Sequence, residues 1–256
     1  MSLLFDFFAP HNEELYKPCG MFTLPHFIAI GILAIILSVL IYLSRNLSKD
    51  KIKFITKILA LVITGFELGK IIYSFYYGYT WPDAWVPLAF CSLFIYSLYM
   101  SGFAKGVIEK IGQSYIAGGG ILAGLFFILF PTTSLMRHPL LHYMCFHSLI
   151  FHGAMFYLGI VYLMRKAYTF NLKEYKYYII FVSIFSIIAI IINIIFDCNM
   201  MFYKEPYNMP IKLVVDIYNF SKVIYTLFIF IAYSSLYLLT YLFYLLIKKI
   251  TKRRTN

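Results

Sequence analysis

Residues 177–196 read YYIIFVSIFSIIAIIINIIF, a run with no charged residue. A helix of about 20 apolar residues spans the hydrocarbon core of a bilayer, so this run predicts a transmembrane helix. The whole chain of 256 residues has the same character, since 62% of it is hydrophobic and only 13% is charged. A soluble domain of this length could not bury so much apolar surface. We therefore predict an integral membrane protein.

Six further apolar runs have the length of a membrane-spanning helix, which predicts an all-α polytopic bundle of seven transmembrane helices. The run at 114–130 is the shortest and contains Gly118, Gly119 and Gly120. Glycines in a membrane helix allow a neighbouring helix to approach closely, and tight packing is the favoured interpretation here. In chain order the seven predicted spans are 22–43, 54–76, 85–103, 114–130, 140–163, 177–196 and 218–247.

The basic residues predict the orientation of the bundle. Cytoplasmic loops of membrane proteins are enriched in Lys and Arg, and here the basic loops all fall on one side. This places the C-terminus in the cytoplasm and the N-terminus outside, in a single membrane domain covering 1–256, with an external segment 1–21 and a basic cytoplasmic tail 248–256. The residues behind this prediction, apart from the tail, are Arg45, Lys49, Lys51, Lys53, Lys105, Lys110, Arg165, Lys166, Lys173 and Lys176.

The net charge of +11 does not indicate a nucleic-acid partner. The basic residues lie in short loops between apolar runs and form no basic face with interleaved aromatic residues. A multi-pass protein of the cell membrane is the consistent interpretation, with a tail attracted to an anionic leaflet.

A thiol and an imidazole inside predicted spans are the most informative polar groups, because polar residues are costly in a membrane. Cys91 is predicted roughly 10 Å from the outer face, and His152 roughly 16–18 Å along its helix. A Cys–His pair is a minimal apparatus for making and breaking thioesters. The other polar candidates fall in the same outer half of the bilayer: His26, Glu67, His147, Asn193 and Asn199.

Each of these residues also has a structural interpretation. A buried Cys is commonly a small apolar side chain, and a buried His needs only hydrogen-bond partners. Glu67 and Lys70 are three residues apart and can neutralise each other on one helix face; alternatively, Glu67 orients a histidine or receives a proton. Cys19 and Cys198 could lie on the same side and pair, which the sequence leaves open.

Metal and cofactor chemistry find no support in the sequence. His147 and His152 are five residues apart and point about 140° away from each other on a helix, so they are not expected to chelate one metal ion. The four cysteines show no CxxC spacing, and no glycine-rich phosphate loop is present. We predict neither a metal nor a cofactor.

Several blocks together resemble the YwaF-like family of bacterial integral membrane proteins. They cover nearly the whole chain in the expected order, although Met200 stands where the family usually has tyrosine. The blocks are FTLPH at 22–26, WVPLAFCS at 85–92, the glycine-rich run 118–131, FHSLIFHGAMFYLGIVYL at 146–163 and NMMFYKEP at 199–206.

The YwaF-like proteins in turn resemble the eukaryotic transmembrane protein 164 family, which is implicated in acyl transfer onto ether-linked lysophospholipids. The resemblance implies a phospholipid acyltransferase or lipid hydrolase of the bacterial cytoplasmic membrane, with Cys91 as nucleophile and His152 as base. Its partner would be a membrane phospholipid or lysophospholipid. The expected substrate-binding or supporting residues are His147, Glu67, His26, Asn193 and Asn199.

Two alternatives belong to other classes. A transporter, or the membrane subunit of one, is the first, but the chain shows no inverted repeat and no polar set in the inner half. A proton-coupled carrier would also be expected to contain more membrane carboxylates. The second alternative is a structural bundle whose His and Cys side chains only form hydrogen bonds.

Overall fold

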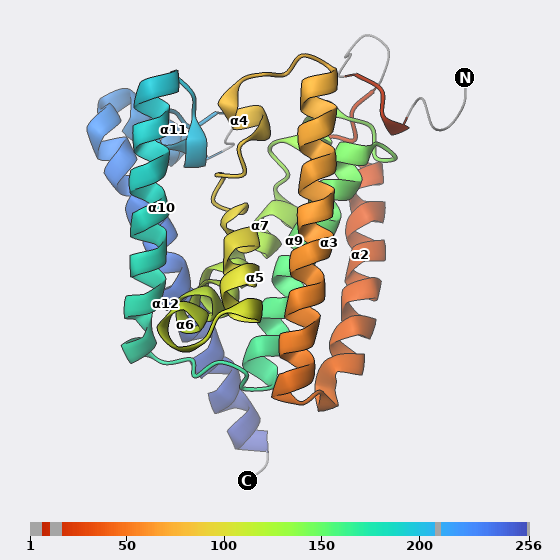
Figure 1. Ribbon diagram of the computed structural model, residues 1–256, viewed down its shortest axis with the longest axis vertical. Helices are drawn as coiled ribbons and strands as arrows, with labels where there is room; N and C mark the ends of the chain where they lie inside the picture. The colour runs from red at the N-terminus through yellow and green to blue at the C-terminus, as the bar shows by residue number, and fades with distance from the viewer. Residues whose placement is uncertain (1–6, 11–16, 208–210, 255–256) are drawn as a thin grey trace.

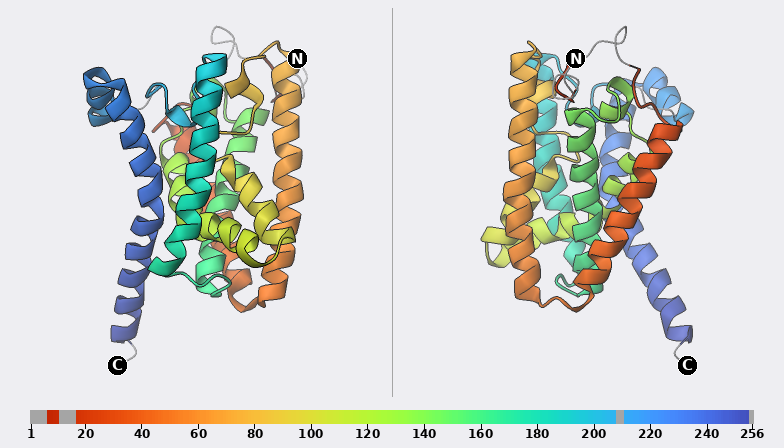
Figure 2. Two further views of the ribbon diagram at one scale, coloured as in Figure 1. Left: turned by 60° about the vertical axis from the view of Figure 1, so that its left-hand side comes forward. Right: turned by 90° about the vertical axis from the view of Figure 1, so that its right-hand side faces the viewer.

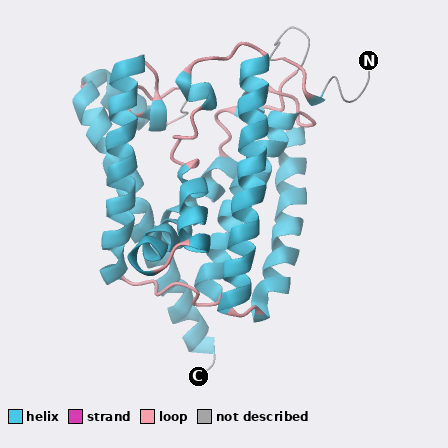
Figure 3. Ribbon diagram, viewed as in Figure 1, coloured by secondary structure: helices cyan, strands magenta, loops and turns pink. Residues whose placement is uncertain are grey.

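The computed structural model describes residues 7–10, 17–207 and 211–254, and within these ranges it contains helices and no strand (Figure 3). The all-α prediction is confirmed. The predicted external segment 1–21 is described only at 7–10 and 17–21, and residues 255–256 of the predicted tail lie outside the described residues.

Long helices run alongside one another and form the body of the molecule (Figures 1 and 2). Residues 7–10 lie at one end of this bundle, called the N-side here, and helix α12 ends at the other, called the C-side. The long helices are α2 (Leu24–Leu43), α3 (Lys49–Tyr76), α9 (Tyr143–Met164), α10 (Tyr175–Phe196) and α12 (Lys222–Arg254).

Among the described residues, six helical stretches have the length and apolar character to cross a membrane. Many of their outward-facing side chains are large and apolar; Ile35 and Ile194, for example, are 68% and 77% exposed. Apolar side chains of this kind favour contact with lipid tails. The helices can lie in lipid because each satisfies its own backbone hydrogen bonds. The stretches are Leu24–Asn46, Lys49–Tyr76, Gly106–Arg137, Tyr143–Met164, Leu172–Phe196 and Lys222–Ile250.

The predicted span 85–103 is not a single helix, which corrects the expectation of seven complete helices. Helix α4 (Pro82–Trp85) is followed by an irregular stretch, 86–92, and only then by α5 (Leu93–Phe103). Pro87 disfavours a helical conformation at the residue before it, and α5 has only 11 residues. At 1.5 Å per residue, α5 covers about half of a bilayer core. The chain therefore enters the bundle from the N-side in an extended form, and α5 begins inside it (Figure 1).

The predicted span 114–130 lies within a longer helical stretch, Gly106–Arg137. In this stretch α6 (Gly106–Ser114) is followed by a π-helical turn η2 (Tyr115–Gly120) and by α7 (Ile121–Leu129). The three glycines lie in η2, and all three are buried. A Cβ atom on Gly118 would lie 2.3 Å from the ring of Tyr237, and one on Gly119 would lie 2.7 Å from the Tyr178 hydroxyl. The expectation of close packing at these glycines is confirmed.

We expect Gly118→Ala to destabilise the bundle by about 1–3 kcal/mol, because the new methyl group overlaps the Tyr237 ring. Gly31→Ala is the matched control, since a Cβ atom there has no neighbour within 4 Å and alanine favours the helix. Thermal unfolding of the purified variants in detergent would measure both. Equal melting temperatures for the two variants would contradict the prediction.

Caps and breaks determine where several helices begin and end. Helix α3 begins at Lys49 rather than 54 because the Ser48 side chain accepts a hydrogen bond from the Lys51 amide. Helix α10 ends where Asp197 adopts a left-handed conformation. Most of the predicted span 218–247 lies in α12, whereas its first residues, 218–220, belong to α11 (Lys212–Phe220). The remaining short elements are η1 (Ser44–Asn46), α8 (Ser134–Arg137), η3 (Leu172–Glu174) and η4 (Met200–Phe202).

Candidate functional site

Cys91 lies in the turn that starts α5, inside the bundle and partly buried. The Phe94 amide donates to the Cys91 carbonyl over 3.0 Å, and the Leu93 amide donates to the Phe90 carbonyl over 3.3 Å. The thiol therefore sits at a helix N-terminus, where the aligned peptide dipoles favour nearby negative charge. The break in the span at 86–92 is what produces this position.

Two tyrosines hold the turn that carries Cys91. The Tyr115 hydroxyl donates to the Phe90 carbonyl over 2.5 Å. The Phe90 ring stacks on Tyr233, with ring centroids 4.1 Å apart and planes inclined by 8°. The sequence carries no signal for this role of the two tyrosines, because an aromatic residue in an apolar run cannot be distinguished from ordinary core packing.

His152 is buried on α9, and its ring stacks on Phe127 of α7 at a centroid distance of 3.7 Å. Its Nδ1 lies 2.7 Å from the Ser148 carbonyl oxygen. A carbonyl can only accept, so Nδ1 carries the proton and Nε2 presents a lone pair. The Nε2 atom is buried and has no hydrogen-bond partner among the described residues. This imidazole is therefore in the tautomer that a general base requires at Nε2.

Cys91 and His152 lie in neighbouring parts of the interior but share no hydrogen bond. Their helices meet through Phe94, one turn beyond Cys91, and Phe151, next to His152, whose ring centroids are 5.9 Å apart. The predicted Cys–His pair thus remains a prediction. Catalytic hydrogen bonds are often long in the absence of substrate, so the separation is compatible with that role.

Glu67 is the centre of a buried ionic cluster. One carboxylate oxygen lies 2.9 Å from His147 Nε2, and the other forms an ion pair with Lys70, one helical turn along α3. The Glu67 side chain is only 4% exposed. Glu67 therefore makes both of the contacts considered above: it forms an ion pair with Lys70, and it contacts a histidine, His147. The cluster joins α3 to α9, the helix that carries His152.

The other three expected supporting residues form hydrogen bonds with backbone groups. His26 accepts the Phe22 amide at Nδ1, and its Nε2 lies 3.0 Å from the Ile128 carbonyl. Asn193 donates to the Met200 carbonyl and accepts the Met200 amide. Asn199 accepts the amides of Lys204 and Glu205. These contacts give each of the three a role in holding loops and helix ends.

The loop after α10 also carries a surface ion pair, between Lys204 and Asp197 at 2.6 Å. The Lys204 ammonium holds the pKa of the Asp197 carboxyl below its usual value. Asp197 is fully exposed, so the pair positions the loop rather than contributing much to stability.

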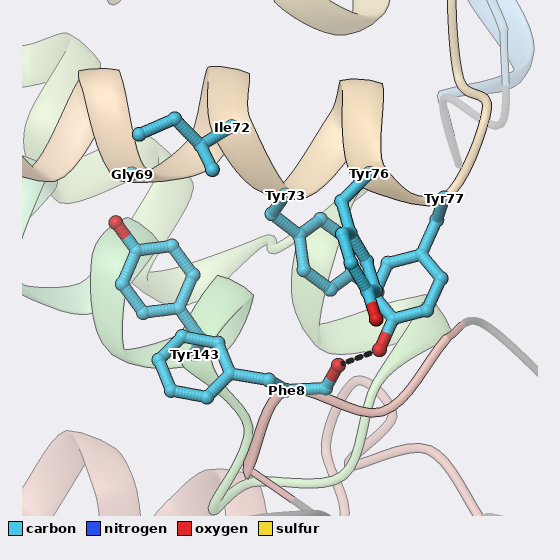
Figure 4. Close-up of a pocket in the computed structure, with 7 residues that line it drawn as sticks. All are labelled: Phe8, Gly69, Ile72, Tyr73, Tyr76, Tyr77 and Tyr143. Atoms are coloured by element: carbon cyan, nitrogen blue, oxygen red, sulfur yellow. Dashed lines mark hydrogen bonds between the residues drawn. The ribbon is translucent and has the colours of Figure 1, made fainter.

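A cavity of about 440 Å³ opens at the N-side between α3, the start of α9 and residue Phe8. Tyr77 donates to the Phe8 carbonyl over 2.6 Å across its rim (Figure 4). Ile72 and Tyr76 are 68% and 79% exposed, so the cavity opens beside the outward face of α3. Neither Cys91 nor His152 lines it. The lining residues are Phe8, Gly69, Ile72, Tyr73, Tyr76, Tyr77 and Tyr143.

No group of three or more His, Cys, Asp or Glu side chains is placed to hold a metal ion within the described ranges. The chemistry available in the interior is instead that of a thiol at a helix N-terminus, a neutral imidazole with a free lone pair, and a buried carboxylate.

The apolar helices and their interior polar groups define a multi-pass helical membrane protein. Comparison with known families then gives its relationship: the chain belongs to the TMEM164 family, whose model matches residues 21–248. The match includes every residue singled out above as catalytic or supporting. No similar protein was found among curated proteins, and none among solved structures.

Proposed function

We propose that this protein transfers or hydrolyses acyl groups of membrane phospholipids through a thioester on Cys91, with His152 as the base. The observation that carries the proposal is the state of His152, whose Nε2 is buried, unpartnered and in the accepting tautomer. A buried acceptor without a partner is costly unless a ligand or substrate supplies the donor. Cys91, at the start of α5 in the same interior, is the proposed donor.

The proposed topology has the chain crossing the membrane seven times, with the N-side outside. The passage through 82–103 crosses as α4, an extended stretch and α5. Basic residues at the C-side support this orientation. Lys53 pairs with Glu109 at 2.7 Å, and Arg165 donates to the Leu47 and Arg45 carbonyls in the loop between α2 and α3. Positive charge of this kind favours the cytoplasmic side.

In the proposed first step, His152 Nε2 takes the proton of the Cys91 thiol. The sulfur attacks the carbonyl carbon of a phospholipid ester, and the ester oxygen leaves as the hydroxyl of a lysophospholipid, taking the proton from His152. Amides in the first turn of a helix have no acceptor within the helix. The Leu93 and Phe94 amides already donate within the turn, so the amides of Cys91 and Ser92 are the proposed donors to the oxyanion.

The second step releases the acyl group. The hydroxyl of a second lysophospholipid, or of water, attacks the thioester while His152 accepts its proton, and the Cys91 sulfur leaves and is reprotonated. An alcohol acceptor makes the protein an acyltransferase, and water makes it a hydrolase. Substrate binding is expected to close the gap between the thiol and the imidazole.

The test is intact-protein mass spectrometry after incubation of the purified protein with phospholipid. We expect a hydroxylamine-sensitive acyl adduct on the wild-type protein and none on Cys91→Ala, because only a thioester has this sensitivity under mild conditions. Cys198→Ala is the matched control, since it also removes a cysteine thiol, but a buried one in the loop after α10. An adduct that persists in Cys91→Ala would contradict the proposal, and unchanged lipids without an adduct would favour the transporter alternative.

A further inference from the structure

Two of the four cysteines lie together at the N-side, apart from the main hydrophobic core. Cys19 is 3% exposed and Cys145 is fully buried, and with Leu135 they form a separate small buried cluster. Cys19 precedes α2, whereas Cys145 lies in the first turn of α9. Tertiary structure therefore brings together two thiols that are far apart in the sequence.

One carbonyl group links the two cysteines. The Cys19 amide donates to the His138 carbonyl oxygen over 2.9 Å. The Cys145 sulfur lies 3.6 Å from the same oxygen and 3.6 Å from the Ser134 carbonyl oxygen, and its thiol can donate to either. The Gly20 amide donates to the Leu135 carbonyl over 2.8 Å, which fixes the Cys19 backbone on the loop before α9. These bonds keep the Cys19 residue beside the Cys145 sulfur.

The remaining cysteines have other surroundings. Cys198 packs in the main core, and its thiol donates to Asn193 Oδ1 over 3.4 Å. Cys91 lies at the start of α5. The pairing of Cys19 with Cys198 that the sequence left open is therefore not the one that the structure brings close.

We propose that Cys19 and Cys145 form a disulfide bond in the mature protein. The proposal rests on the N-side facing the oxidising exterior, as proposed above, and not on the catalytic role of Cys91. Two S–H bonds break and one S–S bond forms. The two electrons and two protons pass to the disulfide of an extracytoplasmic oxidant, which becomes a dithiol.

The bond must form before the cluster closes. Burial raises the pKa of the Cys19 thiol, and an inaccessible, protonated thiol exchanges slowly. Oxidation is therefore expected during insertion, while the segment before α2 is still open. Once formed, the bond ties this segment to the first turn of α9, the helix that carries His147 and His152.

The experiment is quantitative thiol labelling of the full-length protein in isolated membranes. Membrane proteins are denatured in the presence of an alkylating reagent, with and without prior reduction of disulfides. The protein is then purified, and mass spectrometry of the intact protein gives the number of labels. The wild-type protein is expected to take up two fewer labels without reduction than after it. This difference should vanish in Cys19→Ser and in Cys145→Ser, and it should persist in Cys198→Ser.

Full labelling of the unreduced wild-type protein would overturn the proposal. A second arm then shows which premise failed: the reduced protein is unfolded, refolded in detergent with oxidised glutathione, and labelled again. Formation of the Cys19–Cys145 bond only in this arm would refute the exposure to an oxidising compartment, whereas its absence there would refute the geometry. Neither result depends on whether Cys91 carries an acyl group, so the catalytic proposal is tested separately.

Discussion

Glu67→Ala is expected to destabilise the protein by about 3–5 kcal/mol, the usual cost of removing one partner from a buried ion pair. The substitution leaves the Lys70 ammonium, whose side chain is 15% exposed, without its carboxylate, and it removes the partner of His147 Nε2. It also disconnects α3 from α9. Reversible unfolding in mixed detergent and lipid micelles would measure the change in free energy.

Two comparisons make this prediction specific. Asp216→Ala breaks the exposed Lys212–Asp216 pair, whose side chains are 88% and 53% exposed, and should cost less than about 1 kcal/mol. The double variant Glu67→Ala/Lys70→Ala should recover part of the loss, because it no longer buries an unpaired ammonium. A Glu67→Ala variant as stable as Asp216→Ala would show that the cluster does not stabilise the bundle.

His152→Gln is expected to slow acylation of Cys91 by about 10²–10⁴-fold, the usual contribution of a general base. Glutamine keeps the polarity and much of the volume of the site but cannot take the thiol proton. The rate of adduct formation, followed by rapid quenching and mass spectrometry, is the measurement. A melting temperature close to that of the wild-type protein would show that the loss is chemical and not structural.

Ser148→Ala is the matched control for His152→Gln. It lies one turn away on the same helix, and it keeps the carbonyl that accepts from His152 Nδ1 while removing only the hydroxyl bonded to Ser134. The histidine tautomer should therefore be preserved, and acylation should stay near the wild-type rate. If His152→Gln acylates as fast as Ser148→Ala, another group removes the proton.

The predicted spans were accurate where a long apolar run has no internal break. Helix α10 ends at residue 196 as expected, and α2 begins two residues after the predicted 22 and ends at the predicted 43. The prediction that 85–103 forms one complete helix was wrong. The composition of this span is apolar enough to cross a membrane, but Pro87 and the tyrosine contacts of Phe90 favour an extended entry.

For the candidate site, spacing along α3 predicted the contact of Glu67 with Lys70, because residues three apart share a helix face. The partner of Glu67 on α9 could not be derived in this way. Likewise, the sequence placed His152 at depth, but its stacking on Phe127 and its bond to the Ser148 carbonyl depend on how α9 is rotated against α7.

The sequence by itself determined the membrane environment, most of the helices, the distribution of basic residues and the family. The membrane environment and the helices follow from local composition, because transfer of a side chain into lipid depends mainly on its own chemistry. The family follows from the match over residues 21–248. Only the tertiary structure decided that α5 starts just after Cys91, that Glu67 contacts His147 as well as Lys70, and that Cys19 lies beside Cys145. Such contacts join distant parts of the chain, and they are set by the rotation and depth at which the helices pack.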